Sequence, residues 1–264
     1  MWVWGYTFSV SKKKKLIVAN WKMNPGSSAE ARVLFNKVKL SGGKLEKVET
    51  VICPPFSFLG LFPNSGTTRV SLGAQDVFWA NAGRATGEVS PEMLHDLGVS
   101  YVIVGHSERR ALGETDEVVA KKLKAVLAEW LTPIVCVGEK ERDPDGKYFA
   151  VLKAQIVASF AGLARPQFRD ICIAYEPLWA IGKSAKEAMD PRGIREMAIF
   201  IQKVLADSFG EETAQLPRIL YGGSAEESNT VPILAEGGVA GLLVGHASLD
   251  AERFTKMLKS ANTL

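Results

Sequence analysis

Residues 16–22, Leu-Ile-Val-Ala-Asn-Trp-Lys, form the first of several short apolar runs that decide the fold. The run Leu16–Trp21 is apolar except at Asn20, which is typical of a strand buried on both faces of a parallel sheet. Seven later runs have the same character: Thr50–Cys53, Val70–Ala74, Tyr101–Val104, Pro133–Val137, Ile171–Tyr175, Arg218–Tyr221 and Ala240–Val244. Most of them are separated by segments with helical periodicity, including Ala29–Leu40, Glu114–Trp130, Gly146–Ala164 and Arg192–Phe209.

Eight strands that alternate with helices indicate parallel pairing around one core, because parallel neighbours require crossover helices. The average spacing of roughly 32 residues is that of a βαβ unit. An open doubly wound sheet would normally carry a G-x-G-x-x-G turn after its first strand, but here that strand ends in Asn20-Trp21-Lys22. We therefore predict an α/β fold, a closed (β/α)8 barrel of eight parallel strands with outer helices. Residues 14–264 would form this single catalytic domain, and residues 1–13 a loosely attached N-terminal extension.

The charge distribution argues against a nucleic-acid partner. The chain carries a net charge of +3, and residues 1–15 hold four lysines and no acidic residue, so the remaining chain has a charge of −1. A nearly neutral body offers no basic face for a polyanion. No apolar run approaches the roughly 18 residues that a membrane span needs. We expect binding neither to nucleic acid nor to a membrane.

The cysteines and the N-terminus both indicate a cytoplasmic protein. Cys53, Cys136 and Cys172 lie far apart in apolar runs, which fits buried reduced thiols and neither a disulfide framework nor a zinc site. The first residues are aromatic and the lysines follow them, the reverse of the order in a signal peptide.

The residues at the ends of the apolar runs are the candidates for chemistry, because the C-terminal ends of the strands carry the active site in such barrels. Glu176 follows the run Ile171–Tyr175 and precedes the apolar segment 177–182. If this segment closes over it, the carboxylate is desolvated and becomes a stronger base. The alternative is a surface glutamate that caps a nearby helix.

His106, Lys22 and Asn20 end two further strands. A helix that begins near Ser107 would disfavour the imidazolium form of His106, and a neutral imidazole could donate to a substrate carbonyl. The alternative is a structural histidine. Lys22 could pair with an anionic oxygen or with Glu108, or be an ordinary surface lysine. Asn20 lies two residues before Lys22, on the same face of the strand.

Glycine-rich turns cluster in the last third of the chain. They are Gly182, Gly222-Gly223-Ser224, Gly237-Gly238, Gly241 and Gly245. Each alone could be simple turn chemistry. Together they expose backbone N–H groups after the last three strands, where such barrels commonly bind phosphate, so we predict a phosphorylated small-molecule substrate.

Five motifs in order resemble the triosephosphate isomerase family. They are Val18–Asn24 (VANWKMN), Val104–Arg110 (VGHSERR), Ala174–Gly182 (AYEPLWAIG), Tyr221–Ser224 (YGGS) and Leu242–Leu249 (LLVGHASL). The resemblance covers about residues 14–260 and implies an isomerase that interconverts dihydroxyacetone phosphate and glyceraldehyde 3-phosphate through an enediolate, in glycolysis and gluconeogenesis. It implies no cofactor and no metal.

The resemblance also implies roles for individual residues. Glu176 would be the base, His106 the electrophile, Lys22 the charge that stabilises the enediolate, Asn20 a substrate-contacting amide and Glu108 a polar partner behind the site.

The backbones of Gly182, Ser224, Gly245 and His246 would hold the phosphate, and residues 177–185 would form a lid. Residues 76–89, with Thr86 at their tip, would insert into a second subunit, which predicts a homodimer.

Three features depart from the family pattern. Lys183-Ser184 stands where the lid usually reads Thr-Gly, His246 replaces a glycine of the phosphate turn, and residues 1–13 precede the usual start.

Three alternative functions agree less well with the sequence. An aldolase would need a Schiff-base lysine within a strand, but the runs 133–137 and 171–175 contain none and Lys22 is the only candidate. A metal-dependent epimerase would need more histidines than the three present. A catalytically weakened barrel that only binds phosphate could have lost Glu176 or His106, and both are present.

Overall fold

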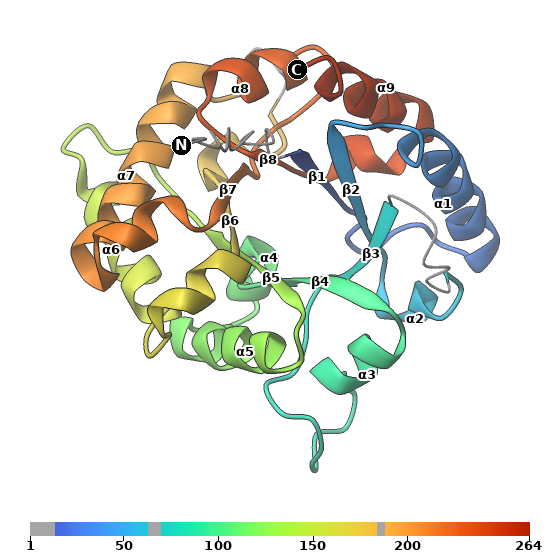
Figure 1. Cartoon of the computed structure of the whole chain (residues 1–264), viewed down its shortest axis with the longest axis horizontal. Coiled ribbons are helices and arrows are strands. Elements are labelled where there is room, and N and C mark those ends of the chain that lie inside the picture. Colours follow the sequence, from blue (N-terminus) through green and yellow to red (C-terminus); the bar gives the residue numbers. More distant parts are fainter. Residues whose placement is uncertain (1–13, 63–69, 184–187) are drawn as a thin grey trace, which may run out of the picture.

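The computed structural model describes residues 14–62, 70–183 and 188–264, and over these residues the chain forms a closed parallel barrel (Figure 1). Its eight strands follow one another around the barrel in sequence order, as predicted. They are β1 (Lys15–Asn20), β2 (Val48–Cys53), β3 (Val70–Ala74), β4 (Val99–Val104), β5 (Thr132–Val137), β6 (Cys172–Tyr175), β7 (Arg218–Tyr221) and β8 (Gly241–Val244). The predicted extension 1–13 and residues 184–185 of the predicted lid lie outside the described residues.

The barrel closes where β1 pairs with β8, with Leu16 opposite Gly241 and Ala19 opposite Val244. Gly241 is required here by close approach, because a Cβ on it would lie 1.8 Å from the carbonyl oxygen of Leu16. The first and last strands of the chain are thus joined without an open edge.

The helices surround the barrel (Figure 1). The α-helices are α1 (Ser28–Gly42), α2 (Phe56–Leu59), α3 (Pro91–Asp96), α4 (Ser107–Ala111), α5 (Asp116–Ala128), α6 (Lys147–Ser159), α7 (Pro191–Phe209), α8 (Thr230–Glu236) and α9 (Ala251–Ala261). The 3₁₀ helices are η1 (Arg165–Asp170), η2 (Leu178–Ala180), η3 (Glu211–Gln215) and η4 (His246–Leu249). The four long helices expected from periodicity are present as α1, α5, α6 and α7, with α6 ending five residues earlier than expected.

Local sequence fixes several helix ends. Asp190 caps the start of α7 by accepting from the N–H groups of Arg192 and Gly193, and Pro191 occupies the first helical position. After α6 the chain turns at Gly162, whose φ of +76° favours glycine. After α5, however, the left-handed position is occupied by Trp130, with φ +59° and 91% of its surface exposed.

Two apolar cores hold the fold together. The larger lies between the barrel and its helices, and a smaller one fills the barrel itself. The smaller core consists of Leu16, Val18, Val51, Cys53, Tyr101, Ile103, Ile134, Cys136, Cys172, Ala174, Leu220 and Leu243. All three cysteines are therefore buried inside the barrel, and burial raises the pKa of the Cys53 and Cys136 thiols.

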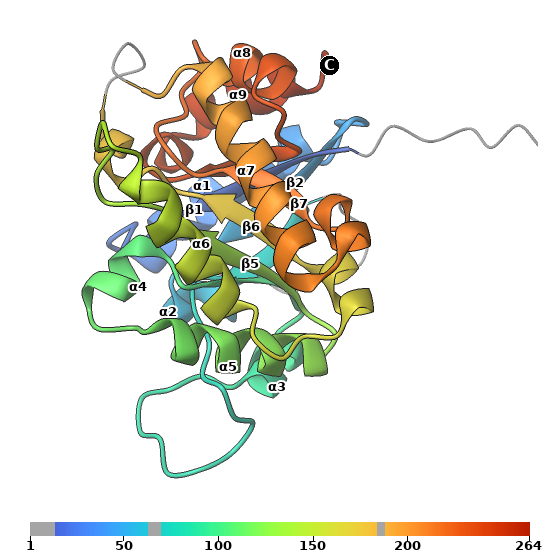
Figure 2. The ribbon, with the colours of Figure 1, turned by 90° about the vertical axis from the view of Figure 1, so that its left-hand side faces the viewer.

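The parallel strands bring all their C-terminal ends to one mouth of the barrel, where the site residues were expected. The segment between β3 and α3 projects from the body on its own (Figure 2). Trp79, Arg84 and Thr86 of this segment are exposed. The segment also contacts its own barrel, since Nδ2 of Asn81 donates to Oε1 of Glu129 at 2.7 Å and Nζ of Lys121 lies 5.7 Å from the centre of the Trp79 ring.

Candidate active site

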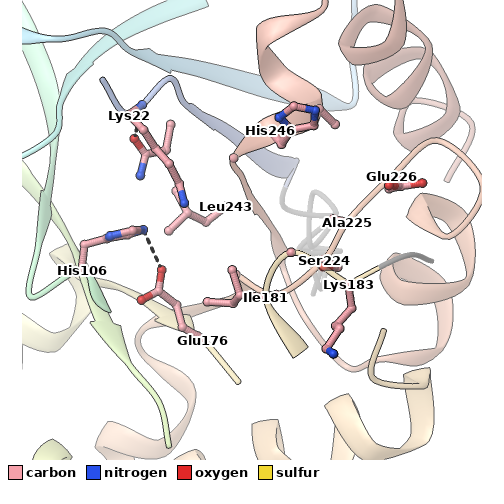
Figure 3. A pocket seen from close by; sticks show the side chains of 16 residues that line it. Lys22, His106, Glu176, Ile181, Lys183, Ser224, Ala225, Glu226, Leu243 and His246 are labelled. Atoms are coloured by element: carbon pink, nitrogen blue, oxygen red, sulfur yellow. Dashed lines mark hydrogen bonds and ion pairs between the residues drawn. The ribbon is translucent and has the colours of Figure 1, made fainter. Parts of the chain in front are cut away.

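A pocket of about 440 Å³ opens at the C-terminal mouth of the barrel, a size typical of small-molecule sites (Figure 3). It is lined by Asn20, Lys22, His106, Glu176, Ile181, Gly182, Lys183, Gly222, Gly223, Ser224, Ala225, Glu226, Leu243, Gly245, His246 and Ala247. The pocket thus brings together all the predicted site residues except Glu108. In Figure 3, Lys22, His106 and Glu176 lie on one side and Ser224, Lys183 and His246 on the other.

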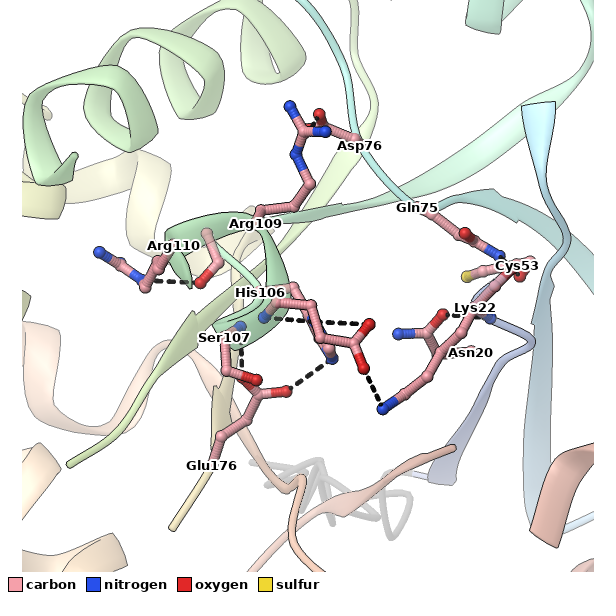
Figure 4. Close-up of polar contacts among 12 residues, drawn as sticks. Asn20, Lys22, Cys53, Gln75, Asp76, His106, Ser107, Arg109, Arg110 and Glu176 are labelled. Carbon is pink, nitrogen blue, oxygen red and sulfur yellow. Dashed lines mark hydrogen bonds and ion pairs between the residues drawn. The ribbon is translucent and has the colours of Figure 1, made fainter. Parts of the chain in front are cut away.

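Glu176 stands directly after β6 and is 2% exposed. Its Oε1 lies 3.1 Å from Nε2 of His106, and its Oε2 accepts from the N–H of Ser107 at 3.0 Å (Figure 4). Burial raises the pKa of Glu176, but the imidazole and the Ser107 N–H outweigh it, so the pKa lies below the usual range of a glutamate. The carboxylate is ionised and able to accept a proton.

His106 immediately precedes α4 and is 6% exposed. Its Nδ1 accepts from the N–H of Glu108 at 3.2 Å, so the first turn of the helix disfavours a proton on that atom. The carboxylates of Glu176 and Glu108 act in the opposite direction. Burial lowers the pKa of His106, yet these two neighbours raise it above that of a free histidine. The prediction that the imidazolium form is disfavoured is therefore wrong for this structure, because the sequence does not show how close the two carboxylates lie to the ring.

Lys22 has a φ of +53°, a strained conformation for a residue with a side chain. Its backbone is held from both sides: its N–H donates to Oδ1 of Asn20 at 3.0 Å, and its carbonyl accepts from Nε2 of Gln75 at 2.8 Å. Its Nζ lies 2.7 Å from Oε1 of Glu108, the pairing expected from the sequence. The ammonium group is therefore aimed over the same cavity as His106.

The glycine turns line the far side of the pocket. Gly182 has φ +73°, and Gly245 packs against the Lys22 side chain, since a Cβ there would meet Cε at 3.2 Å. His246 begins η4, is exposed, and does not have a positive φ, so its backbone is unstrained. Figure 3 shows its imidazole at the rim. Ser224 Oγ donates to the carbonyl of Ala180 at 2.9 Å and joins this side to the start of the predicted lid.

A buried carboxylate anchors the start of the predicted lid. Oε1 of Glu139 accepts from Trp179 Nε1 at 2.8 Å and from Tyr175 OH at 2.7 Å, and the carbonyl of Glu139 accepts from the N–H of Leu178 at 3.0 Å. Glu139 is 1% exposed. Any movement of the segment after Pro177 must therefore pivot on, or break, these contacts.

Three supporting residues were not assigned roles from the sequence. Gln75 and Glu139 each follow an apolar run, which marks both as candidates without indicating a role. Ser107 acts through its backbone N–H, which no side-chain pattern reveals. Gly138 lets β5 pass close to the carbonyl of Glu176, because a Cβ there would lie 1.8 Å from that oxygen.

In residues 14–62, 70–183 and 188–264, no three side chains of His, Cys, Asp or Glu gather in a group that could hold a metal ion. No helix in the same ranges is both long enough and apolar enough to cross a membrane.

Comparison with known proteins gives a consistent result along nearly the whole chain. The family model of triosephosphate isomerase matches residues 15–261. The triosephosphate isomerase of Citrifermentans bemidjiense is 42% identical over 250 residues, covering 94% of this chain and 98% of its own length. That of Moorella thermoacetica is 43% identical over 252 residues, covering 93% and 98%, and that of Endomicrobium trichonymphae is 44% identical over 251 residues, covering 94% and 98%.

Proposed function

The chain belongs to the triosephosphate isomerase family and is an isomerase of dihydroxyacetone phosphate and glyceraldehyde 3-phosphate, and we propose that Glu176, His106 and Lys22 perform this reaction. The observation that carries the assignment is the 3.1 Å contact between Glu176 Oε1 and His106 Nε2 inside the pocket. A base and a proton donor that face one cavity are what a proton shift between neighbouring carbons requires.

In the proposed mechanism, the substrate replaces the contact between Glu176 and His106, so that both side chains face the substrate. The carboxylate of Glu176 takes a proton from the carbon beside the carbonyl while Nε2 of His106 donates to the carbonyl oxygen. His106 then transfers a proton from the hydroxyl of the deprotonated carbon to the former carbonyl oxygen. Glu176 returns its proton to the former carbonyl carbon, which leaves the new carbonyl on the neighbouring carbon and restores both side chains. The enediolate between these steps is anionic, and the ammonium group of Lys22 stabilises it without any reorganisation at the moment of reaction.

The glycine turns hold the substrate phosphate at the other side of the pocket. Backbone N–H groups of Gly182, Ser224, Gly245 and His246 supply the contacts, since main-chain donors beside short helices favour anions. Closure of the segment after Pro177 excludes water, so the reactive enediolate is protected.

The protein acts as a homodimer in the cytoplasm, serves glycolysis and gluconeogenesis, and has its catalytic domain in residues 14–264. Support for the dimer comes from the segment 76–89, which projects from the body and carries the exposed Trp79. Met23, directly after Lys22, and Leu112, directly after α4, are also exposed. Large apolar groups exposed on a projecting loop favour a protein partner.

A coupled isomerase assay on the purified full-length chain tests the catalytic assignment. Wild type should interconvert the two triose phosphates in both directions, and Glu176→Gln should abolish turnover while leaving sulfate binding intact. A folded wild-type protein that binds sulfate but shows no turnover would favour the phosphate-binding barrel without catalysis.

A further inference from the structure

Gly105, the residue before His106, is held on both sides by charged side chains. Its N–H donates to Oε1 of Glu114 at 3.1 Å, and its carbonyl accepts from Nε of Arg110 at 2.7 Å. Its φ is +68°, and a Cβ would lie 2.9 Å from Val119 and 3.0 Å from Arg110 Nη2. This glycine makes the sharp turn from β4 into α4, so its orientation determines where the imidazole of His106 is directed.

Glu114 is itself fixed in a buried cluster of charges. Its Oε2 lies 2.9 Å from Nζ of Lys122, which also lies 2.6 Å from Oδ1 of Asp76. Nε of Arg109 bridges the two carboxylates, at 3.0 Å from Asp76 and 3.4 Å from Glu114. Lys122 is 2% exposed. Burying such a cluster of charges carries a large desolvation cost, so the cluster is weak evidence for a contribution to stability. Its presence therefore calls for a second explanation.

Arg110 completes the arrangement from the opposite side. Besides Gly105, its guanidinium contacts Asp116 Oδ1 at 2.5 Å and donates to the carbonyl of Cys136 at 3.3 Å. Cys136 lies in β5, two residues before the glycine that supports Glu176. The turn that carries His106 is therefore braced against the neighbouring strand. Figure 4 shows Arg109 and Asp76 on the far side of His106 from Glu176.

We propose that Glu114 is a positioning residue for His106, acting through the N–H of Gly105. Lys122 holds the carboxylate of Glu114 in place, and this carboxylate holds the turn at Gly105. The turn directs Nε2 of His106 into the pocket, while Nδ1 of His106 accepts from the N–H of Glu108. Glu114 does not line the pocket. The inference deepens the proposed function, because it rests on the role of His106 as electrophile.

Three variants separate this role from a merely structural one. Glu114→Ala removes the acceptor of the Gly105 N–H and should lower kcat by about 100-fold with little change in KM, since a misplacement of about 1 Å costs that much. Glu114→Gln keeps an oxygen for the N–H and should recover most of kcat. Glu49→Ala removes a less buried ion pair, with Arg218 at the opposite end of the barrel, together with the hydrogen bond from Tyr101, and should leave kcat unchanged in the folded fraction.

Glu114→Ala leaves Lys122 facing one carboxylate fewer and can fail to fold. The double variant Glu114→Leu with Lys122→Met also removes the contact to Gly105 but leaves no buried lysine without a partner. It should show the same loss of kcat. A folded double variant with the kcat of wild type would overturn the proposal.

An activity-independent readout separates this proposal from the proposed function. The chain has three histidines, so ¹⁵N-labelled histidine gives few imidazole signals. Glu114→Ala and the double variant should both shift the imidazole signals of His106, whereas Glu114→Gln and Glu49→Ala should leave these signals in place. Unchanged His106 signals in the double variant refute the positioning role, while a wild type that is inactive with normal imidazole signals refutes only the catalytic assignment.

Discussion

Nε2 of His106 lies 3.1 Å from Oε1 of Glu176, and each group moves the pKa of the other. The imidazole is among the causes that lower the pKa of Glu176, and the carboxylate is the main cause that raises the pKa of His106. Two groups proposed for opposite tasks are thus partners until a substrate separates them. Through this contact, the stability of the protein should depend on pH even without substrate.

The stability of the folded chain should depend on this contact in a defined pH window. The lowered pKa of Glu176 contributes stability that is present above the ordinary glutamate pKa of about 4.3 and lost as pH falls through the folded-state value. The raised pKa of His106 contributes stability that is present below about 6.5 and lost as pH rises through its folded-state value. The advantage of wild type over Glu176→Gln in denaturant unfolding should therefore be largest between these limits. His106→Gln should remove the dependence at the upper limit, and a difference that is flat from pH 4 to 8 contradicts the coupling.

Glu176→Asp should keep the fold and lose turnover by several decades. The carboxylate retreats by one methylene from the carbon that it must reach, and proton transfer depends steeply on distance. Steady-state kinetics in both directions give kcat, and sulfate titration checks that the phosphate end is intact. The assignment of Glu176 as base fails if kcat is unchanged.

Light scattering at micromolar concentration should give the mass of two chains. Thr86→Glu places a charge at the tip of the projecting segment 76–89 and should weaken association at least tenfold. Thr263→Glu, at the exposed C-terminal end, is the matched control and should have no effect. A single-chain mass for wild type would contradict the dimer.

His246→Gly should leave sulfate affinity close to that of wild type. The backbone of His246 is unstrained and can donate to the phosphate whatever its side chain does, and the imidazole lies at the rim of the pocket (Figure 3). Sulfate titration measures the affinity, with His95→Gln as the control. A clear loss of affinity in His246→Gly alone would show that the imidazole also contributes.

Trp130→Gly should stabilise the fold by about 1 kcal/mol. The tryptophan occupies a left-handed backbone conformation that costs a side-chain-bearing residue about 1–2 kcal/mol, and it is too exposed to recover much by packing. Trp130→Ala retains a Cβ and should gain little, which makes it the control. Urea unfolding measures both. A destabilised glycine variant would mean that the indole makes contacts that outweigh the strain.

The strands were predictable because each is a continuous buried run, and the expected limits of Val70–Ala74 and Arg218–Tyr221 agree with the structure. Short helices such as α2, with four residues, contain too little sequence for a periodicity to show. Gly162, which lies within the helix expected to extend to residue 164, has the left-handed conformation that marks the turn after α6.

The positions of the candidate site residues were predictable for the same reason: Lys22, His106 and Glu176 each follow a strand, and parallel strands end at one mouth. Their partners were harder to find. The contact of Glu176 with Ser107 uses a backbone N–H that every non-proline residue has. The carbonyl of Lys22, whose φ is positive, accepts from Gln75, which follows another strand. Such relationships exist only after the strands are assembled.

Closure of the barrel between β1 and β8 has a consequence for biosynthesis. Leu16 meets Gly241 across more than two hundred residues of intervening chain, so a ribosome-bound chain that has not reached residue 241 keeps the edges of β1 and β7 unpaired. Unpaired edges are templates for association with other chains. Contacts this distant in sequence also slow folding, because the loop must close before they contribute. Pairing of β8 with β1 and β7 is therefore the step that removes these unpaired edges. A chain truncated just before β8 should accumulate in inclusion bodies.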